Sequence, residues 1–93
     1  MRFNMEVIDN KEKNRFEASV NGELAIVEYS LMDEVISITH TEVPKALAGQ
    51  GVGSKLTEAV LKHVEERGLK VKPLCPFTKK YIDKHPQWSE IVA

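Results

Sequence analysis

The chain has 93 residues, a formal net charge of −1 and a single cysteine. This length predicts one domain, residues 1–93, and the lone cysteine excludes an intrachain disulfide. The sequence lacks the basic excess of nucleic-acid-binding domains, an apolar run of about 18 residues, and the apolar segment of a signal peptide. We therefore expect a cytoplasmic protein that binds neither nucleic acid nor membrane, and we predict no metal site.

Four segments in the first half of the chain have the alternation and composition of β-strands. They span residues 3–7, 15–20, 23–29 and 35–43. Between the second and third segments, Asn21-Gly22 is a strong signal for a tight hairpin. The consecutive apolar residues at 24–27 predict that the third strand is buried on both faces.

Simple alternation along the fourth segment assigns its side chains to two faces of the sheet. It places His40 and Glu42 on the face that carries Ile36 and Ile38. Thr41 falls on the opposite face, together with the other odd-numbered residues of the segment.

From Val52 the apolar period changes to about 3.6 residues, which predicts an amphipathic helix that ends at Gly68. Residues 69–74 predict a fifth strand, and a strand–helix–strand crossover makes it parallel to the fourth. Pro76 suits the first position of a second helix with Cys75 as its N-cap. Its apolar face is predicted from Phe77, Tyr81 and Ile82. The expected fold is therefore a mixed α/β sheet.

The loop before the first helix contains three alternating glycines, Gly49, Gly51 and Gly53. Glycine allows positive φ and close approach to the main chain, and the N–H groups of a first helical turn have no intrahelical partner. Such a turn favours an anion, most often a phosphate or pyrophosphate. The order of residues fits neither a P-loop nor a dinucleotide fingerprint. The alternative is a glycine-rich helix start that binds no ligand.

The run Ala48–Gly53 resembles the acetyl-coenzyme A pyrophosphate loop of the GCN5-related N-acetyltransferases. That family has Gln or Arg, any two residues, Gly, any residue, then Gly or Ala. Gly51 and Gly53 match, whereas Ala48 replaces the Gln or Arg and removes one side-chain contact. The stretches HTEVPKALAGQGVGSKL and PLCPF resemble the small proteins of this family, and so does the order of predicted elements.

The resemblance implies that the cosubstrate is acetyl-coenzyme A and that two segments bind it. The pyrophosphate would lie on the loop residues Ala48, Gly49, Gln50, Gly51, Val52, Gly53 and Ser54, mainly on the N–H groups from Gln50 onward. The pantetheine arm would pair with the strand edge at Thr41, Glu42 and Val43, as an added strand does. Lys79 and Lys80 are either solvated or contacts of the adenosine 3′-phosphate.

The acceptor stays open, because helices and strands that form the acceptor pocket of larger family members have no counterpart in this sequence. An open site would admit a protein tail, a polyamine, a small molecule, or a second subunit of a homodimer.

Four residues are candidates for the chemistry of acetyl transfer. Cys75 lies at a predicted helix N-terminus, which lowers a thiol pKa, although a lone cysteine is more often a small buried hydrophobe. His40 and Glu42 could accept a proton, or could be only the polar end of a strand. By resemblance, Tyr81 would protonate the departing thiolate, and core packing explains it equally well.

The leading hypothesis is an acetyl-coenzyme A-dependent N-acetyltransferase that acetylates an amine. One alternative is a non-catalytic module that binds acetyl- or acyl-coenzyme A, which Ala48 and the reduced acceptor region favour. The other is an interaction domain that needs no cofactor.

Overall fold

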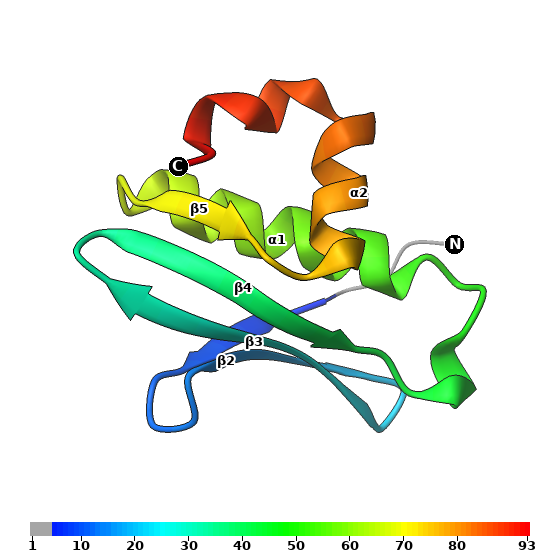
Figure 1. The fold of residues 1–93 in the computed structure, drawn as a ribbon. Helices are drawn as coiled ribbons and strands as arrows, with labels where there is room; N and C mark the ends of the chain where they lie inside the picture. Colours follow the sequence, from blue (N-terminus) through cyan, green and yellow to red (C-terminus); the bar gives the residue numbers. More distant parts are fainter. Residues whose placement is uncertain (1–4) are drawn as a thin grey trace.

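The computed structural model describes residues 5–93 and contains a five-stranded sheet with strand order β1-β2-β3-β4-β5 (Figure 1). The strands are β1 (Val7–Asn10), β2 (Arg15–Val20), β3 (Glu23–Met32), β4 (Val35–Glu42) and β5 (Lys70–Pro73). Neighbours pair antiparallel except β4 and β5, which pair parallel. The predicted mixed α/β sheet is therefore confirmed. The predicted bounds of the first strand, residues 3–7, are wrong at Met5 and Glu6, which belong to no strand, and the strand continues to Asn10. Phe3, the predicted start, lies outside the described residues.

Two tight hairpins set the antiparallel register. Asn21 and Gly22 have φ of 52° and 79°, which is the turn that the Asn-Gly pair predicts. Asp33 and Glu34 make a turn of the same kind, with φ of 50° and 68° and no glycine. This second turn carries little sequence signal, and β3 consequently runs further than predicted, to Met32.

The helices cover one face of the sheet and leave the other open (Figure 1). Most buried apolar side chains of the strands lie on the covered face and include Phe16, Val27, Ile36 and Ile38, whereas Ile26 is buried on the other face. The prediction that the third strand is buried on both faces is confirmed at Ile26, which is 7% exposed, and is wrong at Leu24, which is 46% exposed. Within residues 5–93 no helix packs over Leu24, because the helices lie on the other face.

A β-bulge in β4 changes which side chains face the helices. Glu28 pairs with His40 and Tyr29 pairs with Ile38, so Thr39 has no opposite residue. Directly opposed residues share a face, and Thr41 pairs with Val27 of the core. The predicted faces of β4 are therefore wrong beyond Thr39. Thr41 shares the helix-covered face with Ile38, whereas His40 and Glu42 point to the open face.

The predicted helices are present with small changes. A 3-10 turn, η1 (Lys45–Leu47), precedes α1 (Val52–Glu66), and Gly68 follows α1 with φ of 68°. α2 (Pro76–Lys84) has Cys75 as its N-cap, as predicted, and η2 (Pro86–Ile91) buries its Trp88 side chain.

Phe77 corrects the predicted apolar face of α2. It is 43% exposed, and the residues that α2 buries are Thr78, Tyr81 and Ile82. Among residues 5–93, no helix is long and apolar enough to cross a membrane.

Candidate functional site

The sheet splits where β4 and β5 diverge. The two strands pair from Val35 with Lys70 to Ile38 with Pro73. The last bond across them joins the N–H of Cys75 to the carbonyl of Ile38 at 2.9 Å. Beyond it, β5 leads into α2 while β4 continues toward the glycine loop (Figure 1). No strand within residues 5–93 pairs with the outer edge of β4 past Ile38, which leaves the predicted pantetheine edge accessible.

The glycine loop presents a row of free N–H groups. Gly49 and Gly51 have φ of 77° and 75°, and Gly51 is the N-cap of α1. The N–H groups of Gly51, Val52, Gly53 and Ser54 find no acceptor in the part of the chain that the structure describes. They lie at the positive end of the α1 dipole, so this arrangement suits an anion.

Two of the predicted loop donors are used within the loop itself. The N–H of Ala48 donates to the carbonyl of Lys45 at 3.0 Å, and that of Gln50 donates to the carbonyl of Leu47 at 3.4 Å. The Gln50 side chain also donates to the carbonyl of Ala46 at 3.2 Å. These bonds shape the loop, so the consecutive row of free donors begins at Gly51 rather than at Gln50.

The third glycine of the motif is required for packing rather than for backbone conformation. Gly53 lies inside α1 and is not among the glycines with positive φ. A Cβ atom at Gly53 would lie 2.8 Å from Cζ of Phe77. The Phe77 ring therefore rests directly on the first turn of α1, beside the free N–H groups. The sequence signal for this contact is that Phe77 directly follows Cys75-Pro76, at the predicted start of the second helix.

Cys75 lies at the point where the strands split, and its side chain is 5% exposed. The Sγ atom is 3.6 Å from Oγ1 of Thr41. Burial raises the pKa of the Cys75 thiol, but the backbone N–H of Thr78 and the Thr41 hydroxyl favour the thiolate and lower the pKa overall. No side-chain hydrogen bond caps α2, and the sulfur lies at the positive end of this helix.

The other three catalytic candidates do not gather around Cys75. His40 and Glu42 are exposed on the open face of the sheet. The Tyr81 hydroxyl donates to the Glu58 carboxylate of α1 at 3.4 Å, and the Tyr81 ring stacks on His85 at 4.1 Å. Burial and the Glu58 charge raise the pKa of Tyr81. Tyr81 therefore joins α2 to α1.

Sequence patterns did not predict two side-chain hydrogen bonds, one at the split and one at the start of α1. The Thr41 hydroxyl reaches Cys75 only because of the bulge, which alternation does not predict. The buried Thr57 hydroxyl donates to the Gly53 carbonyl at 2.8 Å and steadies the first turn of α1. No cluster of three or more possible metal ligands occurs within residues 5–93.

Comparison with known proteins shows what this arrangement is similar to. The family profile of the GCN5-related N-acetyl-transferases matches residues 15–91. Protein NATD1 of Gallus gallus is 29% identical over 85 residues, which cover 88% of this chain and 77% of that protein. Protein NATD1 of Mus musculus is 30% identical over 80 residues, which cover 83% of this chain and 73% of that protein.

A solved structure supports the same assignment. A Staphylococcus aureus protein, described as GCN5-like and solved in solution by NMR, is 34% identical and superposes with a TM-score of 0.73. The match covers 97% of this chain and 89% of that chain. Sequence and fold therefore agree over nearly the whole molecule, and the chain belongs to the GCN5-related N-acetyltransferases.

Proposed function

We propose that residues 1–93 act as a single domain that binds acetyl-coenzyme A and transfers its acetyl group to an amine. The observation that carries this proposal is the row of free N–H groups from Gly51 to Ser54, next to the split between β4 and β5. Together they offer an anion site and an unpaired strand edge, which are the two features that a pyrophosphate and a pantetheine arm need.

We expect the coenzyme to contact the chain in three places. The N–H groups at the start of α1 would hold the pyrophosphate. A hollow of about 140 Å³ between α1 and α2, lined by Ser54, Phe77 and Lys80 among others, would take the adenosine end with its phosphate. The edge of β4 from Thr41 to Val43 would pair with the amide groups of the pantetheine arm. The thioester would then lie near the split, where Cys75 is found.

Transfer at this point requires a neutral amine, a polarised carbonyl and a leaving thiolate. The amine nitrogen attacks the thioester carbon, the C–N bond forms, and the C–S bond breaks. The proton leaves the nitrogen for a base, for which Glu42 and His40 are the candidates on the open face. Tyr81 is the remaining candidate for returning a proton to the leaving thiolate, once its hydroxyl is released from Glu58.

Cys75 offers a second route to the same product. Its thiolate would attack the thioester carbon, displace the coenzyme A thiolate and carry the acetyl group as a new thioester. The amine would then attack that thioester and release the Cys75 thiolate. The lowered pKa of Cys75 and its position at the split support this route.

Intact-mass analysis tests the transfer. The protein is incubated with acetyl-coenzyme A and a panel of amines, and both the protein mass and the amines are measured. Acetylated amine formed by the wild type but not without protein supports transfer. Loss of turnover in Cys75→Ser, with binding retained, supports the route through Cys75. Retained binding with no product across the panel would instead favour the non-catalytic acyl-coenzyme A-binding module.

A further inference from the structure

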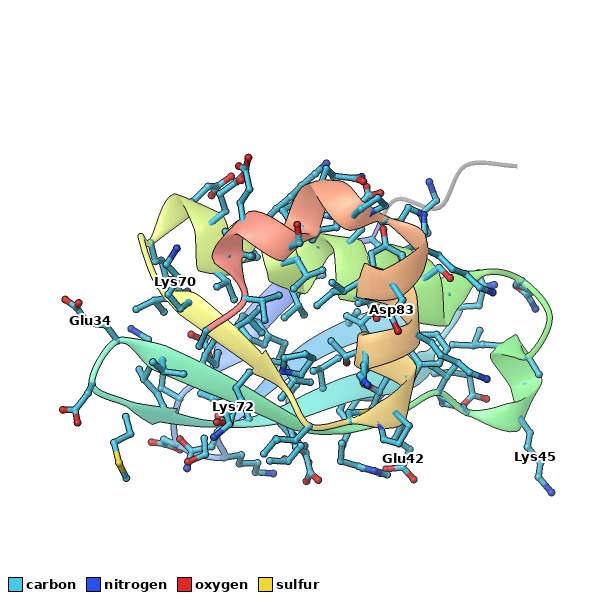
Figure 2. The ribbon with its side chains drawn as sticks, turned by 45° about the horizontal axis from the view of Figure 1, so that its top comes forward. Glu34, Glu42, Lys45, Lys70, Lys72 and Asp83 are labelled. Atoms are coloured by element: carbon cyan, nitrogen blue, oxygen red, sulfur yellow. The ribbon has the colours of Figure 1, made fainter. Side chains whose placement is uncertain are left out.

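A hollow of about 440 Å³ opens on the face of the sheet that the helices leave uncovered. Its floor is apolar and includes Leu24 and Ile26 of β3 and Val43 just beyond β4. Glu42 and Lys45 line it and are both exposed. In Figure 2 these two side chains extend toward the lower side of the view, away from α1. The hollow therefore combines an apolar floor with one acidic and one basic group.

Only the width of strand β4 separates the hollow from the split between β4 and β5. Glu42 directly follows Thr41 in β4, and consecutive strand side chains point to opposite faces. Thr41 reaches Cys75 on the helix side, at 3.6 Å, whereas Glu42 faces the hollow. A nitrogen held by Glu42 would thus lie beside the strand edge along which we place the pantetheine arm.

The charges around the hollow discriminate between acceptors. Arg15 also lines it, but its Nε is engaged by Glu17 at 2.6 Å. Glu42 and Lys45 have no ion-pair partner among residues 5–93. One free anion and one free cation, three positions apart, suit an ammonium and a carboxylate on one small molecule. The free Lys45 ammonium would repel the second ammonium of a polyamine or a lysine-rich tail.

We propose that this hollow binds the acceptor and that the acceptor is a free α-amino acid with an apolar side chain. The inference rests on the proposed acetyl transfer. Glu42 binds the ammonium, Lys45 pairs with the carboxylate, and the apolar side chain lies on Leu24 and Ile26. The ammonium first gives one proton to solvent, and Glu42 takes a second proton from the neutral amine nitrogen as it attacks the thioester carbon. The C–N bond forms, the C–S bond breaks, and coenzyme A leaves as the thiolate.

An NMR titration of isotopically labelled protein tests binding separately from turnover. L-leucine, isopentylamine and spermidine are added in turn. Leucine should shift the resonances that line the hollow, those of Leu24, Ile26, Val43 and Lys45. Isopentylamine, which lacks the carboxylate, and spermidine should bind at least about tenfold more weakly, as expected for the loss of one charge-assisted contact.

Two variants test whether Glu42 contacts leucine. Glu42→Gln keeps the backbone edge and the side-chain shape, and should weaken leucine binding about tenfold. Glu66→Gln makes the same change on an exposed part of α1 outside the hollow and should leave leucine binding unchanged. Equal leucine affinity in the two variants would overturn the role of Glu42.

The acceptor inference and the proposed function fail in different ways. If acetyl-coenzyme A binds but leucine shifts no resonance of the hollow, or if spermidine is acetylated more efficiently than leucine, only the acceptor inference is overturned. If leucine binds in the hollow but acetyl-coenzyme A binds nowhere, the amino-acid site stands and the transfer reaction is overturned. N-acetylleucine formed by the wild type and lost in Glu42→Gln would support both.

Discussion

At the scale of single residues, the contact between Gly53 and Phe77 joins the start of α1, beside the glycine loop, to α2, which begins directly after Cys75. Gly53→Ala should destabilise the protein by up to about 1 kcal/mol, because the new Cβ displaces the Phe77 ring, which is itself 43% exposed. In a Phe77→Leu background the ring atom that clashes is gone. The same Gly53→Ala change should then be neutral or stabilising by up to about 1 kcal/mol, because alanine has a higher helix propensity than glycine.

Urea unfolding of the two single variants and the double variant measures this coupling as a double-mutant cycle. Additive changes in the free energy of unfolding would show that Phe77 does not rest on Gly53. Gly51, whose φ is 75°, should behave differently, since Gly51→Ala is strained whichever residue stands at position 77.

The Cys75 thiol should ionise at a lower pH in the folded protein than in the unfolded chain. The cause is the balance described above, in which the Thr78 amide and the Thr41 hydroxyl outweigh burial. Thr41→Val keeps the shape of the side chain and removes the hydroxyl, so the pKa of Cys75 should rise. The pH dependence of thiolate absorbance gives the pKa of Cys75 in the wild type and in Thr41→Val, and urea-unfolded protein gives the reference value. A midpoint unchanged by Thr41→Val would contradict the contact.

At the scale of elements, a polar cluster ties β1 to β3 and to the end of α1, at the opposite end of α1 from the glycine loop. The Tyr29 hydroxyl donates to Asp9 at 2.5 Å, and Arg67 donates to the other Asp9 oxygen at 2.7 Å. Burial and the Asp9 carboxylate raise the pKa of Tyr29 to about 12. Burial of Asp9 acts against ionisation, but its bonds to Tyr29 and Arg67 lower its pKa overall.

Tyr29→Phe should destabilise the protein by about 1–2 kcal/mol at neutral pH, since it leaves a largely buried carboxylate with one partner fewer. The raised pKa of Tyr29 means that its contribution is complete below pH 10 and is lost as the pH rises toward 12. The wild type should therefore lose its advantage over Tyr29→Phe across that range. Unfolding of both proteins by urea between pH 7 and 12 checks this, and a constant difference would argue against it.

The elements also show which features local sequence could predict. The Asn21-Gly22 hairpin, the start of α1 after the glycines and the Pro76 helix start are all set by the conformational limits of a few neighbouring residues. The bulge at Thr39 is set by the pairing of β3 with β4, so alternation within β4 could not reveal it. For the same reason the sequence predicted the glycine loop and the place of Cys75, but not the contact of Thr41 with Cys75.

At the scale of the whole molecule, the two faces of the sheet carry different kinds of surface. The helices bury one face and meet the glycine loop at one end, where the strands split. The other face stays open and carries His40, Glu42 and the apolar hollow. A cosubstrate along the edge of β4 and an acceptor on the open face would meet at this strand, which explains how a short chain could hold both.

The melting temperature with and without acetyl-coenzyme A tests the central claim most directly, in the wild type and in two matched variants. Gly51→Asp puts a negative charge at the proposed pyrophosphate site, and Gly68→Asp makes the same change at a second glycine with similarly positive φ. Ligand at about 100 times its dissociation constant should stabilise the wild type by about 2.7 kcal/mol, which is several degrees for a chain of this size. We predict that Gly68→Asp keeps this shift and Gly51→Asp loses it. No shift in the wild type at millimolar ligand, or equal shifts in both variants, would contradict acetyl-coenzyme A binding at the glycine loop.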